Sequence, residues 1–239
     1  SVVFANANTG EVLISAEERG DKESINIDLI STRAQYEPGS SLKIFSIGLA
    51  LEQGLLDEKT EYYVEDTIEL IENSCQKDFK GYKGCYKDFL KHEPYNLSVK
   101  EIIERSSNVG TIIATKDLNI NDLEEFLSKF GFSKRTGIEL SGESKGSFDP
   151  NKTCTTCLSS LSIGYSINVT QMQMVKAYSI IANGGKNVDL TLIKSPYSNY
   201  SPNQVIDSNS SERLKNLLIN VVEGENGTGR SIFMENYTI

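Results

Sequence analysis

The chain has 239 residues, 38% of them hydrophobic and 24% charged, with a formal net charge of −9 at pH 7. This size favours one large domain, which we place at residues 1–239. The negative charge disfavours nucleic acid and anionic membrane surfaces as partners, and no apolar run approaches the roughly 20 residues of a membrane span. Because Ser1 opens directly into a strand-like run, no signal peptide is visible in this sequence.

An N-terminal hairpin is the first element that the sequence predicts. Apolar runs at residues 2–4 and 12–14 flank Asn8-Thr9-Gly10, whose residue types form tight turns, and this pattern is typical of a β-hairpin. The acidic and polar stretch at residues 17–28 then indicates a loop.

A buried helix follows, and the rest of the chain is organised around it. Pro38 and Gly39 interrupt the preceding chain, and from Ser40 a helical pattern carries apolar residues on nearly every side until Gly54. A helix that is apolar all round belongs inside a domain. Its first turn nevertheless holds Ser40 and Lys43, which at i and i+3 project from one face.

Ser40 and Lys43 suit the roles of nucleophile and general base. A serine hydroxyl needs a neighbour that accepts its proton, and desolvation lowers the pKa of a buried lysine towards that task. The helix N-terminus also offers backbone N–H groups to an oxyanion. The structural alternative is that Ser40 caps the helix while Lys43 extends to solvent. The short S-x-x-K pattern also occurs at residues 74–77, without helical periodicity.

Residues 57–95 differ in composition from the helix before them. They are charged, rich in tyrosine and interrupted by Gly81 and Gly84. This composition predicts a surface excursion, which could form one wall of a cleft.

The four cysteines allow several interpretations. Cys154 and Cys157 form a C-x-x-C, whereas Cys75 and Cys85 flank a loop and have the wrong spacing for a zinc ribbon. The alternatives are a structural metal site, a Cys75–Cys85 disulfide and buried free thiols, of which we favour free thiols. His92, the only histidine, permits a Ser-His-Asp triad, but no G-x-S-x-G elbow accompanies it.

A second helical region begins at Ser98, which forms a capping box with Glu101. The segment Ser106-Ser107-Asn108 follows, and a second apolar helix starts after it. Small polar side chains at such a junction can face a cavity, or Ser107 or Asn108 can simply cap the second helix.

Three more helices are predicted in the remainder of the chain. Asn121 caps the first of them, and Thr170 with Gln173 forms a capping box at the start of the second. The segments are a helix from 121 to 130, turn and extended chain at 136–143, a small-residue loop at 160–165, a helix ending at Gly184, an amphipathic helix from about 211 to 222, and a flexible loop at 224–230.

The ordered set of these motifs resembles the transpeptidase domain of class B penicillin-binding proteins, and within it the septal, cell-division transpeptidases. S-x-x-K, an S-D-N-type element and K-T-G are the motif set of penicillin-binding proteins and class A β-lactamases. The segments that carry the resemblance are 36–43, 105–110, 130–132 with 136–140, 162–165 and 182–185.

The resemblance implies a mixed α and antiparallel β fold of the penicillin-binding protein and serine β-lactamase type. It implies that Ser40 attacks the penultimate D-alanine carbonyl of a peptidoglycan stem peptide and that Lys43 is its general base. Ser106 would relay protons, and Asn108 would bind the substrate amide and help to hold Lys43. A second stem peptide would take the acyl group, β-lactams would acylate Ser40, and no metal or organic cofactor is implied.

The third motif, K-T-G, is not found where the resemblance places it, after Gly227-Thr228-Gly229. We reject Arg135-Thr136-Gly137 as this motif, because it stands where relatives have a non-catalytic Thr-Gly. We therefore expect a domain that lacks its last sheet strands, and a fragment that is inactive alone. Loss of one oxyanion donor costs on the order of 100 to 1000-fold in rate.

The whole protein is expected at the inner membrane, facing the periplasm, anchored by a segment outside this sequence and in contact with other division proteins. Two alternatives remain open: a β-lactam-binding sensor or non-catalytic divisome scaffold, and a serine β-lactamase. The β-lactamase needs a carboxylate that holds the deacylating water, for which Glu139 and Glu143 are near in sequence but not in the expected position.

Overall fold

The computed structural model describes residues 1–17, 30–78, 80, 84–148, 154–194 and 203–238. The chain forms two compact units, the first from residues 1–37, 125–148 and 167–213, the second from 38–124, 149–166 and 214–239. The predicted loop at residues 17–28, apart from Glu17, and the predicted break at Gly81 lie outside the described residues. The assignment of residues 1–239 to a single domain stays a prediction.

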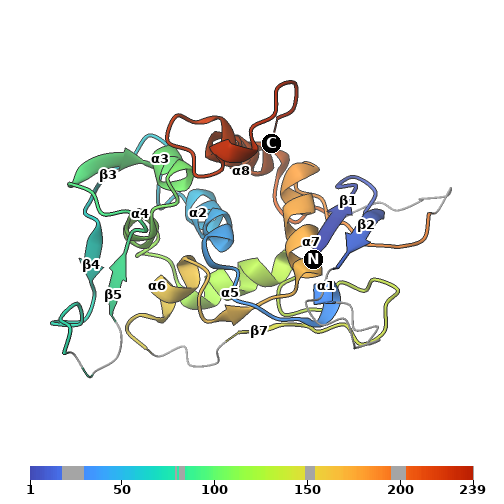
Figure 1. The fold of residues 1–239 in the computed structure, drawn as a ribbon, viewed down its shortest axis with the longest axis horizontal. Coiled ribbons are helices and arrows are strands. Elements are labelled where there is room, and N and C mark those ends of the chain that lie inside the picture. The colour runs from blue at the N-terminus through green and yellow to red at the C-terminus, as the bar shows by residue number, and fades with distance from the viewer. Residues whose placement is uncertain (18–29, 79, 81–83, 149–153, 195–202, 239) are drawn as a thin grey trace. The chain divides into compact units, whose positions relative to one another are not determined.

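The first unit contains the predicted hairpin (Figure 1). Strand β1 (Val2–Ala5) pairs antiparallel with β2 (Val12–Ala16), and Gly10 supplies the positive φ of 74° that the turn requires. The other elements of this unit are α1 (Ile30–Arg33), the pair β7 (Ser147–Phe148) and β8 (Ile167–Asn168), and α7 (Gln171–Ala182). The hairpin prediction is confirmed.

A small apolar core holds the first unit together. Ile138, Met172, Val188 and Leu190 form its buried centre, and Val3 of the hairpin packs against them. Removal of this apolar surface from water stabilises the unit by about 25 cal/mol per Å².

The second unit is built around α2 (Lys43–Glu52), which follows a 3₁₀ turn, η1 (Gly39–Leu42). Every residue of α2 except Glu52 is buried, as predicted for a helix that is apolar on nearly every side. Helices α2, α3 (Val99–Glu104) and α4 (Asn108–Ala114) pack against one another (Figure 1). The short helices α6 (Cys157–Ser162) and η2 (Arg230–Ile232) also belong to this unit.

Two antiparallel strand pairs lie within or at the end of the segment that was predicted as a surface excursion. Strand β3 (Glu61–Val64) pairs with β6 (Tyr95–Ser98), and β4 (Thr67–Glu69) pairs with β5 (Cys85–Lys87). The role of residues 57–95 as an excursion of the domain stays a prediction.

Both predicted capping boxes are confirmed. The side chain of Ser98 accepts a hydrogen bond from the N–H of Glu101 while the Glu101 carboxylate accepts one from the N–H of Ser98, and Thr170 and Gln173 do the same at α7. Each pair satisfies two N–H groups that the helix start would otherwise leave without partners.

Three boundaries differ from the sequence-based expectation. The prediction of a small-residue loop at 160–165 was wrong for its first three residues, because α6 extends to Ser162. Helix α5 (Ile120–Lys129) begins before Asn121, and Asn119 Oδ1 accepts from the Asn121 N–H. Helix α8 (Ser208–Glu223) starts earlier than expected, because Asp207 accepts hydrogen bonds from its first N–H groups.

No helix among the described residues combines the length and the apolar character that crossing a membrane requires.

Candidate active site

The turn that carries Ser40 is fixed at its base by glycine contacts. Gly39 has a φ of 55° and donates its N–H to the carbonyl of Gly164 at 3.0 Å, and a Cβ on Gly164 would stand 1.9 Å from the Gly39 oxygen. No side chain caps η1 or α2, so the alternative in which Ser40 acts as a helix cap does not hold. Ser40 is exposed instead and lines a cleft of about 540 Å³.

Lys43 does not extend to solvent, contrary to the structural alternative. Its side chain lies in the core, with the residue 1% exposed, and Nζ donates to the carbonyl oxygen of Ser106 at 2.5 Å and to Ser106 Oγ at 3.1 Å. Burial lowers the pKa of Lys43 to about 8, although the negative charge of Asp88 opposes this shift. A substantial neutral fraction of this amine therefore exists near neutral pH.

Ser106 sits in the connection between α3 and α4 with a positive φ of 55°, which is uncommon for a residue other than glycine. The following residue, Ser107, caps α4 by accepting the Gly110 N–H at 2.8 Å. The capping alternative therefore holds for Ser107. The carbonyl and hydroxyl oxygens of Ser106 instead accept hydrogen bonds from the Lys43 amine.

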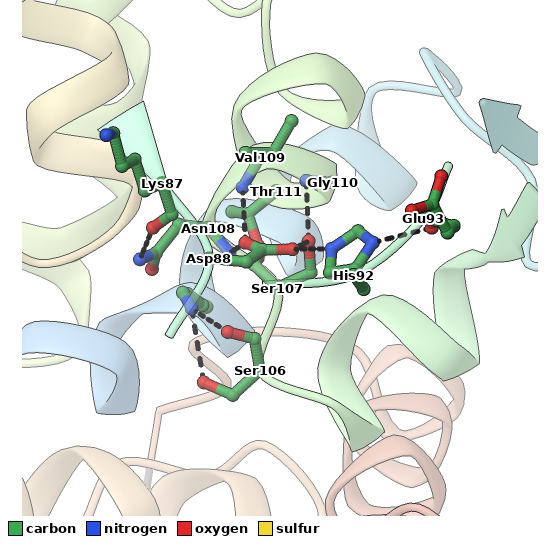
Figure 2. A network of polar contacts seen from close by, with 11 residues as sticks. Lys87, Asp88, His92, Glu93, Ser106, Ser107, Asn108, Val109, Gly110 and Thr111 are labelled. Atoms are coloured by element: carbon green, nitrogen blue, oxygen red, sulfur yellow. Dashed lines mark hydrogen bonds and ion pairs between the residues drawn. The ribbon is translucent and has the colours of Figure 1, made fainter. Parts of the chain in front are cut away.

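Asp88, which sequence analysis did not single out, organises this connection. Figure 2 shows its carboxylate at the start of α4, where it accepts from the N–H groups of Asn108 at 2.6 Å and Val109 at 3.0 Å. It also accepts from Ser107 Oγ at 2.8 Å. An isolated aspartate after a short strand carries no sequence signal, because its partners lie about 20 positions further along the chain.

Asn108 is oriented by strand β5. Its side-chain amide donates to the carbonyl of Lys87 at 2.7 Å, whereas the resemblance led us to expect a contact with Lys43. The side-chain oxygen of Asn108 has no hydrogen-bond partner among the described residues. Asn108 lines the same cleft as Ser40 and Ser106.

His92 supports Asp88 and takes no part in a serine triad. Its Nε2 lies 3.1 Å from Asp88 Oδ2 and its Nδ1 lies 2.9 Å from the Glu93 carbonyl, so neither ring nitrogen faces a serine. Burial opposes protonation, but the hydrogen bonds to Glu93 and Asp88 outweigh it and raise the pKa of His92. The ring stacks on Tyr95 with centroids 4.2 Å apart.

The loop at residues 224–229 contributes Thr228 to the cleft. Glu104, a buried carboxylate at the end of α3, accepts the Asn226 N–H at 2.7 Å, and its backbone carbonyl accepts the Thr228 N–H at 3.2 Å. The cleft therefore collects residues from η1, β5, α4 and this loop, all in the second unit.

The four cysteines form two disulfides, Cys75–Cys85 and Cys154–Cys157. The favoured prediction of free thiols was wrong, and disulfide bonding also excludes these residues as zinc ligands. Each pair is close in sequence, and spacing alone does not distinguish a thiol pair from a disulfide. Among the described residues, no group of three or more His, Cys, Asp or Glu side chains could hold a metal ion.

The other residues that sequence analysis weighed have structural contacts in the first unit. Glu143 accepts hydrogen bonds from the N–H and hydroxyl of Thr136 and from the Gly137 N–H. Glu139 accepts from the hydroxyl of Thr191 and the N–H of Leu192. Thr136 and Gly137 thus form a turn around a buried carboxylate.

The fold is that of a penicillin-binding protein transpeptidase domain. A crystal structure of penicillin binding protein 3 from Mycobacterium tuberculosis, complexed with ampicillin, is similar with a TM-score of 0.79 and 25% identity. The similarity covers 97% of this chain and 54% of that one.

The chain belongs to the penicillin binding protein transpeptidase domain family, whose model matches residues 1–239. It is 27% identical to penicillin-binding protein PbpB of Mycolicibacterium smegmatis over 100% of its length, and 26% identical to a probable peptidoglycan D,D-transpeptidase FtsI of Caulobacter vibrioides over 95%. The matched part is 39% and 38% of these two relatives. The resemblance and the fold class predicted from the sequence are confirmed.

Proposed function

We propose that the protein carrying this chain is a serine-type peptidoglycan D,D-transpeptidase of cell division, with Ser40 as nucleophile and Lys43 as general base. The observation that carries the proposal is the buried amine of Lys43, held by Ser106 beside a cleft that Ser40, Ser106 and Asn108 line. Family membership and relatives named D,D-transpeptidases support it.

Acylation begins with a proton transfer. Neutral Lys43 has two N–H groups, which its contacts with the Ser106 carbonyl and hydroxyl can engage, and its lone pair remains for the proton of Ser40. Ser40 Oγ then forms a bond to the penultimate D-alanine carbonyl carbon. The C–N bond to the terminal D-alanine breaks, and Ser106 passes the proton from Lys43 to the departing amine.

Transfer completes the reaction. The amine of a second stem peptide attacks the ester carbonyl on Ser40, a new amide bond forms as the C–O bond to Ser40 Oγ breaks, and the proton lost by the amine passes through Lys43 to the serine oxygen. Asn108 can accept a substrate amide N–H, because its side-chain oxygen has no hydrogen bond among the described residues and its amide is already held by Lys87. These steps use no metal or cofactor.

Penicillins acylate the same serine in this proposal, because their strained amide presents a carbonyl to the same cleft. The structure of a relative in complex with ampicillin supports this ligand class. We place the protein at the extracytoplasmic face of the inner membrane, in contact with other division proteins. The two disulfides support an oxidising compartment, since cytoplasmic thiols are kept reduced.

The test is covalent labelling of the intact protein with a fluorescent penicillin. Ser40→Ala should abolish labelling, whereas the matched variant Ser41→Ala, which loses a hydrogen bond to the Pro38 carbonyl, should keep it. Equal labelling of the Ser40→Ala protein would remove the nucleophile. Rapid turnover of a chromogenic penicillin, or labelling without any cross-linking of stem peptides, would replace the transpeptidase with a hydrolase or a sensor.

A further inference from the structure

A second cavity adjoins the catalytic cleft. It has a volume of about 230 Å³ and shares Asp88, Phe89, Arg105, Ser106 and Thr228 with the cleft, so the two spaces communicate within the second unit. The mechanism proposed above gives no role to the positively charged side chain that lines this second cavity.

Arg105 supplies that charge. Its guanidinium carbon lies 5.2 Å from the centre of the Tyr95 ring, which stacks in turn on His92 with an interplanar angle of 15°. This stack holds the planar guanidinium in place. Arg105 Nε is buried and has no hydrogen-bond partner, and no ion pair of Arg105 occurs among the described residues.

The nearby carboxylates are already committed to other partners. Asp88 accepts three hydrogen bonds at the start of α4 and contacts His92, and Glu104 holds the loop at residues 224–229. Hydrogen bonds from the backbone and hydroxyl of Ser98 chiefly lower the pKa of Glu101, and the charge of Arg105 is a smaller cause. None of the three carboxylates forms an ion pair with Arg105.

Two neutral side chains share the cavity with Arg105. Asn226 and Thr228 line it, and Glu104 fixes the backbone of both. Neither the Thr228 hydroxyl nor the Asn226 amide has a hydrogen bond among the described residues. The cavity therefore presents a fixed guanidinium, a hydroxyl and an amide, each with donors to spare.

We propose that this second cavity is a carboxylate-binding subsite, in which Arg105 binds an acidic group of the peptide that reacts at Ser40, at a position remote from the scissile bond. The inference rests on the proposed function. A planar guanidinium binds a carboxylate through two parallel N–H···O bonds, and Thr228 and Asn226 can donate to the remaining lone pairs. The chain has a net charge of −9 and therefore repels anions in general. An acidic group of the substrate is therefore expected to bind beside the Arg105 guanidinium.

A matched pair of penicillins tests the subsite. Benzylpenicillin and its α-carboxy derivative differ only by one side-chain carboxylate, and the rate constant of Ser40 acylation is measured for each on the same protein. The ratio of the two rates cancels any loss of folded protein. Arg105→Gln should lower the ratio of α-carboxy to benzyl rate about tenfold. Arg105→Lys, which keeps the charge but loses the planar fork, should give an intermediate ratio.

Lys87→Gln is the control for charge in general, because Lys87 lines the catalytic cleft but not the second cavity. Its ratio should stay within about twofold of the unaltered protein, as expected for an exposed charge. An unchanged ratio in Arg105→Gln, or an equal fall in Lys87→Gln, would overturn the subsite while leaving Ser40 acylation intact. Absence of acylation by both penicillins would instead overturn the proposed function, and the inference with it.

Discussion

The rate at which a penicillin acylates Ser40 should rise with pH along a single titration curve centred near pH 8. Burial lowers the pKa of Lys43 to about 8, and only the neutral amine can accept the serine proton. The sign follows directly: below the pKa Lys43 is protonated and the reaction is slow, and above it the base is available. The perturbation is the pH itself, varied from about 6 to 10.

The size of the effect follows from the same pKa. At pH 7 a lysine with a pKa of about 8 is about 9% neutral, whereas at the ordinary value of 10.5 it would be about 0.03% neutral. Burial of Lys43 therefore provides roughly 300-fold more base at pH 7. Between pH 7 and the plateau, the acylation rate should rise about elevenfold.

The assay is the second-order rate constant of acylation by a fluorescent penicillin, with circular dichroism at each pH to verify that the protein stays folded. His92→Gln is the control for a second titrating group. His92 contacts Asp88, and the charge of Asp88 acts on the pKa of Lys43. Its curve should keep the midpoint near pH 8. A rate independent of pH, or a midpoint near 10.5, would refute the assignment of Lys43 as the base.

Three further perturbations follow from the site. Asp88→Asn should lower the free energy of unfolding by about 1–3 kcal/mol, measured in urea, because the start of α4 loses a charged acceptor. It should also move the acylation midpoint below that of the unaltered protein, since this carboxylate raises the pKa of Lys43. Gly164→Ala should cost clearly more stability than Gly137→Ala and should slow acylation. Glu104→Gln should cost about 1 kcal/mol and should speed proteolysis of the loop at residues 224–229.

The two glycine variants form a matched pair. Both positions have positive φ, 86° and 84°, so each alanine pays about 1–2 kcal/mol of backbone strain. Only at Gly164 would the new Cβ meet the Gly39 oxygen, whereas nothing lies within 4 Å of it at Gly137. Equal losses at the two sites would show that the close approach beneath Ser40 contributes nothing. A raised or unmoved midpoint in Asp88→Asn, or an unchanged cleavage rate in Glu104→Gln, would contradict the corresponding reasoning.

Features that depend on neighbours in the chain could be predicted from the sequence. The capping boxes at Ser98 and Thr170 and the hairpin turn at Gly10 need residue types at fixed short spacings, and the structure has all three. The prediction that Ser40 and Ser106 line one cleft depended on the resemblance, because each short motif taken alone fits many sequences.

Contacts between distant segments could not be predicted in this way. Asp88 binds the start of α4, which lies about 20 residues further along the chain. Arg105 lies over the ring of Tyr95 and lines one cavity with Thr228. No periodic pattern records such contacts, since they depend on how strands and helices pack. The positive φ of Ser106 is likewise imposed by the junction that it occupies.

The arrangement of the disulfides bears on how the protein matures. The bonded cysteines are separated by 10 positions in one pair and 3 in the other, and every alternative pairing would enclose a far longer stretch of chain. Short loops lose the least entropy on closure. An oxidant that meets the unfolded polypeptide therefore favours the native linkages from the outset, and the two disulfides should form without an enzyme that reshuffles them.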